Sequence, residues 1–168
     1  MNTADSAKFF KLLCLVILVV GWSACNNDTL EEPPIPPPTS TRVIYEGSPI
    51  TFEKVDGTDP ADAINQDRIT DNVWLTRSPD GGEIFNAKVE SGPTKGSSPA
   101  GTQWAVGSID NIDELDFKTF RNATRPREAV GKDLVLFLIE DEVFIPIKFT
   151  KWSSGKNNGG FAYERATE

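Results

Sequence analysis

The sequence contains no histidine, and among its 168 residues there are only two cysteines and one methionine. The lack of histidine excludes Ser-His-Asp catalysis, histidine proton transfer and histidine-ligated metal sites. Positive charge is also scarce, since 17 Lys and Arg stand against 25 Asp and Glu and give a net charge of −8. Nucleic-acid binding needs a basic surface that replaces phosphate counterions, so the composition argues against a nucleic-acid partner.

Long hydrophobic runs are missing as well: no apolar run reaches the length of about 20 residues that a membrane span needs. The longest apolar run covers residues 12–20, follows Lys8 and Lys11, and leads through small residues to Cys25. This order is typical of a secretory signal peptide. The residues before Cys25 resemble a bacterial lipobox, although Trp22 stands where Leu, Val or Ile is usual. The resemblance to Bacteroidota-type lipoproteins implies a lipid on the Cys25 sulfur and an anchor in the outer membrane.

Residues 1–24 are therefore expected to be a signal peptide that is removed. Ordinary secretion with cleavage after Ala24, or an uncleaved anchor, are the alternatives. Cys14 lies in the apolar run and would be lost with it. If Cys25 is lipidated, no disulfide can form, and the fold must depend on its hydrophobic core.

Residues 25–41 have the composition of a disordered tether. Five of the twelve prolines fall between Pro33 and Pro38, and such a segment favours extended polyproline II at about 3.1 Å per residue. The acidic residues Asp28, Glu31 and Glu32 resemble the export signal of surface-exposed Bacteroidota lipoproteins. The resemblance implies a domain that faces outward, whereas simple solvation of the tether is the alternative.

Residues 42–168 predict one all-β domain. Turn-forming Gly, Pro and Asp separate short runs that are rich in Val, Ile, Phe, Trp and Thr, which favours an antiparallel β-sandwich or barrel of about eight to nine short strands. Helical turns are expected only at 60–66 and 110–115. The strands are expected at 43–46, 50–55, 72–77, 83–90, 102–107, 115–121, 133–140, 143–151 and 160–166.

Residues 134–152 form the strongest local pattern. The first half is apolar on both faces, and the second half alternates apolar and polar residues after the acidic turn 140–142, which predicts a central β-hairpin. Pro146 cannot donate a hydrogen bond to a neighbouring strand. We therefore expect the second strand to lie at a sheet edge or to be bulged at Pro146.

Five segments resemble a recurring, functionally uncharacterised module of secreted bacterial proteins. The resemblance covers about residues 70–166 and implies an extracellular β-rich domain, but it brings no catalytic residues. The segments are VWLTR, NAKVE, SPAGTQWAVG, LIEDEVFIPIKFTKWSSG and GGFAYERAT.

Acidic residues suggest two kinds of chemistry. Asp110, Asp113 and Asp116 lie close together in the sequence, and oxygen-rich loops of extracellular β domains can hold a structural Ca²⁺. The EF-hand spacing is absent, so a solvated loop is the alternative. Paired carboxylates would also suit a glycosidase, but no motif supports one.

Aromatic and basic side chains suggest a binding surface. Trp152 and Trp74 are candidates for stacking on a sugar, with Trp152 expected to be partly exposed. Arg121 and Arg125 could hold an acidic glycan, or could simply pair with the many carboxylates. Residues 156–160 are expected to be a glycine-rich hairpin connection rather than a phosphate loop.

The sequence thus favours a non-enzymatic, extracellular binding module on a cell-envelope lipoprotein, with a glycan as the candidate ligand. A structural or accessory subunit of an envelope protein complex is the alternative, and a small glycosidase-type enzyme is the third hypothesis.

Overall fold

The computed structural model describes residues 42–168, so the expected signal peptide, Cys25 and the tether lie outside the described residues. This part of the chain is nearly all β, with one short α-helix, α1 (Phe120–Thr124). Short 3-10 turns are η1 (Ala63–Asn65), η2 (Ile109–Glu114), η3 (Pro126–Glu128) and η4 (Gly155–Asn157). The strands are β1 (Val43–Ile44), β2 (Ile50–Lys54), β3 (Asp67–Arg68), β4 (Trp74–Ser78), β5 (Gly81–Asn86), β6 (Thr102–Val106), β7 (Leu134–Leu138), β8 (Val143–Trp152) and β9 (Phe161–Arg165).

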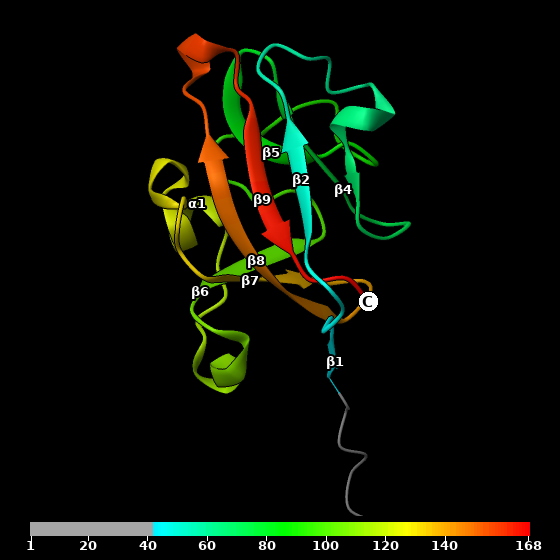
Figure 1. Cartoon of the computed structure of the whole chain (residues 1–168), viewed down its shortest axis with the longest axis vertical. Helices are drawn as coiled ribbons and strands as arrows, with labels where there is room; N and C mark the ends of the chain where they lie inside the picture. Colours follow the sequence, from blue (N-terminus) through cyan, green and yellow to red (C-terminus); the bar gives the residue numbers. More distant parts are fainter. Residues whose placement is uncertain (1–41) are drawn as a thin grey trace, which may run out of the picture. The chain divides into compact units, whose positions relative to one another are not determined.

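The strands form two sheets (Figure 1). The larger has the order β2-β9-β8-β7-β6, with β1 added alongside β8, and the smaller has the order β3-β4-β5. All pairs are antiparallel except β1 with β8, and both sheets are open in the described part. The expected all-β, sandwich-type fold is confirmed. In residues 42–168 no helix has the length and apolar character needed to cross a membrane.

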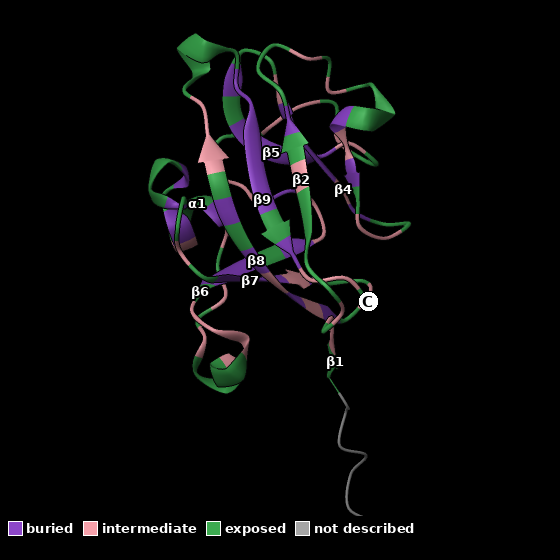
Figure 2. Cartoon of the chain, in the orientation of Figure 1, coloured by how far each residue is buried: buried purple, intermediate pink, exposed green. Residues whose placement is uncertain are grey.

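The core lies between the sheets and α1. It joins Leu75 of β4 and Trp104 of β6 to Phe120 of α1 and to the inner faces of β7, β8 and β9. Leu136 and Ile145, opposite each other in β7 and β8, are fully buried. Figure 2 shows β9 buried over most of its length, whereas β8 alternates between buried and more exposed residues. The predicted central hairpin is therefore confirmed.

The expectation that β8 lies at an edge, or is bulged at Pro146, is wrong. β8 is an inner strand, and its register shift falls between Phe149 and Lys151. On the side away from β7, β1 pairs with the start of β8, and β9 pairs from Ile147 onward. Pro146 lies between these two partners, and its carbonyl accepts from the Ala166 N–H at 3.1 Å. Since the nitrogen of a strand residue faces the same side as its carbonyl, the missing donor falls in this gap.

One expected strand is absent, and one observed strand was not expected. The segment 115–121 is not a strand, because only one isolated bridge, Trp104 with Lys118, connects it to β6 before α1 begins. Its apolar residues serve different faces, since Phe120 is buried in the core while Phe117 packs on Phe137 and Phe144. The strand β3 was not expected, because its two residues are charged and show no apolar alternation. The predicted helical turns are present as η1 and η2.

Candidate functional site

A hollow of about 680 Å³ lies where three parts of the chain meet. These are the β4–β5 hairpin, the segment from α1 to η3, and the end of β8 with η4. The volume falls within the range of about 300–1,000 Å³ that is common for ligand sites. The lining residues are Arg77, Gly82, Glu83, Arg121, Arg125, Pro126, Arg127, Glu128, Trp152, Ser154 and Gly155. The hollow thus brings together three of the four predicted ligand-binding residues: Trp152, Arg121 and Arg125.

Arg77 is a buried cation in the wall of this hollow, only 2% exposed. Its Nε donates to the Gly82 carbonyl at 2.9 Å, and its Nη1 donates to the carbonyls of Ser153 and Gly160 at 2.9 and 3.0 Å. Within residues 42–168, no carboxylate forms an ion pair with Arg77 and Nη2 has no hydrogen-bond partner. Burial lowers the pKa of Arg77 to about 10, although the charge of Asp56 opposes this shift.

The Trp152 ring packs against the guanidinium of Arg77. The Arg77 Cζ lies 3.9 Å from the centroid of the Trp152 ring, so the guanidinium covers one ring face. The same ring packs against Phe120, Phe149 and Phe161, with centroid distances of 5.6, 5.7 and 6.2 Å. Trp152 is partly exposed, as expected, but the face covered by Arg77 is not free to stack on a sugar. The pair instead forms one wall, in which the indole holds the cation in place.

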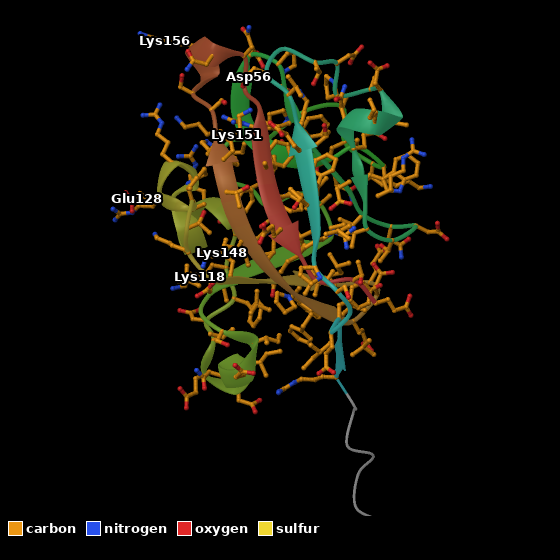
Figure 3. All side chains as sticks on the ribbon, viewed as in Figure 1. Asp56, Lys118, Glu128, Lys148, Lys151 and Lys156 are labelled. Carbon is orange, nitrogen blue, oxygen red and sulfur yellow. The ribbon has the colours of Figure 1, made fainter. Side chains whose placement is uncertain are left out.

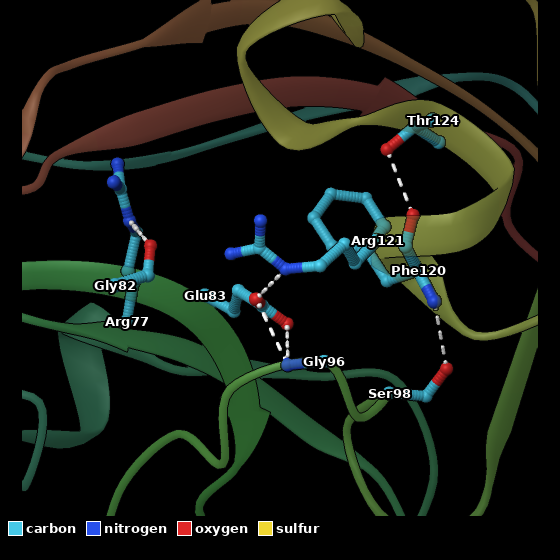
Figure 4. A network of polar contacts seen from close by, with 8 residues as sticks. All are labelled: Arg77, Gly82, Glu83, Gly96, Ser98, Phe120, Arg121 and Thr124. Atoms are coloured by element: carbon cyan, nitrogen blue, oxygen red, sulfur yellow. Dashed lines mark hydrogen bonds and ion pairs between the residues drawn. The ribbon is translucent and has the colours of Figure 1, made fainter.

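Arg121 extends from α1 toward the β4–β5 hairpin, where it pairs with Glu83 (Figure 4). Glu83 is 3% exposed, and its two carboxylate oxygens also accept from the Gly96 N–H at 3.1 and 3.2 Å. Arg121 remains 44% exposed and uses only Nε in this contact. Its two Nη groups have no partner in the described part of the chain, and Figure 4 shows the guanidinium extending toward Arg77.

The rim of the hollow is formed by Arg125, Arg127 and Glu128. Arg125 is 80% exposed and lies 3.7 Å from Glu128, which also pairs with Lys132 at 3.8 Å. Figure 3 shows Glu128 projecting outward from this segment. Arg127 forms no ion pair within residues 42–168. Four arginines and two glutamates therefore line the hollow, which makes it positive in a protein whose net charge is −8.

The glycine-rich loop after β8 fixes this geometry. As expected, it connects β8 to β9, and it packs directly on the β4–β5 turn. Gly159 has a φ of +67°, and a Cβ there would lie 2.5 Å from the Ser78 carbonyl oxygen. The Gly160 N–H donates to Asp56 at 2.7 Å. The Ser153 hydroxyl and the Gly160 amide together lower the pKa of Asp56. This contact holds the carbonyls that orient Arg77.

Trp74, the fourth predicted residue, lies in a different hollow of about 640 Å³. Two cations already stand over its ring, Arg68 at 4.1 Å and Lys88 at 4.7 Å from the centroid. Asp71 and Asp141 are among the residues that line this second hollow. The structure therefore does not bring Trp74 together with Trp152.

The predicted calcium ligands are engaged separately. Asp110 accepts from the Ser108 hydroxyl at 2.9 Å, Asp113 pairs with Arg42, and Asp116 pairs with Lys118. Among residues 42–168, no three or more His, Cys, Asp or Glu side chains converge on one point. The calcium site stays a prediction that this geometry does not support.

Sequence reasoning missed Arg77 and Glu83, which are the two buried charges of the hollow. A signal was present, because Arg77 follows Leu75 by two residues and alternation places both on one face of β4. A charged residue at a position that the pattern assigns to the core is worth testing as a site residue.

No family model, no curated protein and no solved structure matches this chain. The function is therefore argued from the geometry of the arginine-lined hollow.

Proposed function

We propose that this protein is a cell-envelope lipoprotein whose β domain is a non-enzymatic binding module for glycans, with the arginine-lined hollow as its binding site. The observation that carries the proposal is a hollow whose two central arginines are held by contacts within the protein. Arg77 is fixed by three backbone carbonyls and by the Trp152 ring, and Arg121 is fixed by Glu83. Preorganised donors reduce the entropy that binding would otherwise lose.

The donors suit a hydroxyl-rich ligand. Each guanidinium presents several N–H groups and no acceptor. Within residues 42–168, Nη2 of Arg77 and both Nη groups of Arg121 have no partner, and both side chains line the hollow. Sugar hydroxyl and ring oxygens are acceptors that such donors can reach. The volume of about 680 Å³ suits a small part of a polymer rather than the flat surface of a folded protein.

The two carboxylates of the hollow favour binding over hydrolysis. Glycosidases use one carboxyl group as an acid and another as a base or nucleophile. Both oxygens of Glu83 are held by the Gly96 N–H, and one also meets Arg121. Glu128 is exposed and shared between Arg125 and Lys132. Glu83 is therefore already engaged within the protein, and in the described part of the chain no second buried carboxylate lines the hollow to complete a catalytic pair.

A second candidate function, a subunit of an envelope complex, is favoured by one observation. Phe117, Phe137 and Phe144 form an aromatic cluster, with Phe137 and Phe144 stacked at 4.3 Å. These rings are only partly buried and lie on the face of β7 and β8 opposite to the core. Apolar clusters that reach the surface are common at protein interfaces.

The test is a glycan-binding screen on the full-length protein in detergent, with Trp152→Ala and Trp74→Ala as a matched pair. Trp152→Ala should weaken binding about tenfold or more, because it removes the ring that supports Arg77. Trp74→Ala should leave binding unchanged, because Trp74 lies in another hollow. Thermal melts of both variants check folding. Equal losses in the two folded variants would contradict the assignment of the site.

A further inference from the structure

We propose, building on the binding function above, that the hollow selects acidic glycans by holding a carboxylate or sulfate group against Arg77 and Arg121. The shared chemistry is an oxyanion carried on a sugar.

Arg77 is a buried cation without a paired negative charge in residues 42–168. A buried cation is unfavourable unless it is paired, and the carbonyls around Arg77 satisfy Nε and Nη1 without supplying a negative charge. Asp56 is near enough to act on Arg77 through its charge, but it forms no ion pair with it. An oxyanion in the hollow would supply the missing counter-charge to Nη2.

The second buried arginine, Arg165, differs from Arg77 in having a carboxylate partner. Arg165 is also buried, and it meets both oxygens of Asp67 at 2.6 and 2.8 Å. At Arg165 the fold thus supplies a carboxylate to a buried guanidinium. Arg77 lacks such a partner within residues 42–168, and it is Arg77 that lines the hollow.

Arg121 offers a second set of donors for an oxyanion. Its Nε is used by Glu83, so that Nη1 and Nη2 remain as a pair on one edge of the guanidinium. A planar edge of this kind matches the two oxygens of a carboxylate or sulfate group. Arg125 and Arg127 add positive charge at the rim, where Arg125 is only weakly paired with Glu128.

The overall charge of the protein is opposite in sign to that of the hollow. With a net charge of −8, the protein as a whole repels polyanions, so a non-specific attraction is not expected. An acidic glycan would bind only where the local charge is reversed. Such binding should weaken at high salt, because screening reduces the attraction at the partly exposed rim.

Dextran sulfate and neutral dextran provide the decisive comparison, since they share one backbone and differ in charge. Polygalacturonate tests a carboxylate in place of a sulfate. Binding to the full-length protein in detergent is measured by affinity electrophoresis at low and at moderate salt. We expect at least one acidic polymer to bind about tenfold or more tightly than dextran, and the tighter of the two identifies the preferred oxyanion.

Arg121→Gln and Arg125→Gln are the test variants, because both side chains are partly or largely exposed and their loss should leave the fold intact. Arg121→Gln should weaken acidic binding about tenfold, and Arg125→Gln should weaken it less. Arg68→Gln is the matched control, since it removes an arginine that lies over Trp74 in the other hollow. Arg77→Gln is added only if thermal melts show that it folds.

The outcomes separate the inference from the proposed function. Dextran bound as tightly as dextran sulfate, with Arg121 still required, would overturn the acidic selectivity and leave the glycan function in place. A protein that binds none of the screened glycans, neutral or acidic, would overturn both. Equal losses in Arg68→Gln and Arg121→Gln would show a diffuse charge effect and would overturn the assigned site.

Discussion

The two buried arginines show how single residues are stabilised in this fold. Arg165 of β9 meets Asp67 of β3, and the Tyr163 hydroxyl donates to the same carboxylate at 2.7 Å. Burial lowers the pKa of Arg165, but the hydrogen bonds and charge of Asp67 outweigh it and the pKa is raised overall. These contacts join the smaller sheet to the larger one.

Replacing Asp67 tests how much this network contributes to stability. Asp67→Asn should lower the free energy of unfolding by about 3–5 kcal/mol, because it leaves the buried Arg165 charge without its partner. Urea unfolding measures the loss. Asp133→Asn is the control, because its pair with Lys148 is exposed (Figure 3 labels Lys148) and such pairs contribute about 0–1 kcal/mol. Similar small losses in both variants would contradict a structural role for the network.

Tyr163 should make the free energy of unfolding fall at alkaline pH. Burial, together with the charge of Asp67, raises its pKa well above the ordinary value of 10.0. The folded protein therefore keeps the phenol proton after the unfolded chain has released it. The contribution of Tyr163 is complete below pH 10.0 and is lost as the pH rises from there toward the folded pKa.

The corresponding variant is Tyr163→Phe, which has no phenol to ionise. Between about pH 9 and pH 11, the free energy of unfolding should fall more steeply in the unmodified protein than in the variant. Urea unfolding over this range measures both slopes. Lysines contribute to the two proteins alike, so parallel slopes would show that Tyr163 is not the group responsible.

At the scale of elements, prediction from sequence worked where the pattern was local. The β7–β8 hairpin followed from an apolar run and the alternation after it, and η1 and η2 overlap the segments 60–66 and 110–115 that were expected to be helical turns. The prediction for the segment 115–121 failed because the alternation of Phe117 and Phe120 fits a strand, whereas the segment makes only one isolated bridge to β6 before α1 begins at Phe120. Arg121, Arg125 and Trp152 were singled out individually, but nothing in the sequence placed them beside Arg77. Their meeting depends on contact between two loops far apart in the chain.

That contact is tested by Gly159→Ala. The new Cβ would lie 2.5 Å from the Ser78 carbonyl, in a backbone conformation with a φ of +67°. We expect a loss of about 1–3 kcal/mol in stability together with weaker ligand binding, because the loop that holds Arg77 must move. Gly131→Ala is the control, with a φ of +81° and no atom within 4 Å of its Cβ. If it loses as much binding as Gly159→Ala, the loop contact does not shape the site.

At the scale of the whole molecule, the lipid anchor is the prediction with the clearest test. Cys25 lies outside the described residues, and the charged and apolar segments before it are the features that indicate lipidation. Cys25→Ser should move the protein from the membrane to the soluble fraction, because no thiol remains for the lipid. Labelling with radioactive palmitate measures the modification directly. A Cys25→Ser protein that still takes up label would contradict the assignment.

β8 has a mechanical consequence if the protein is anchored at one end and bound to a polymer at the other. β1 pairs with the first residues of β8, and Trp152 ends the same strand, about 30 Å away at 3.3 Å per residue. Tension between the cell and its substrate would then run along the axis of β8 and load its hydrogen bonds to β7 and β9 in shear. The pairing of β1 with β8 covers only two residues, so it would break before the longer pairings of β8. The chain released in this way would lower the tension on the hollow before the binding site itself is distorted.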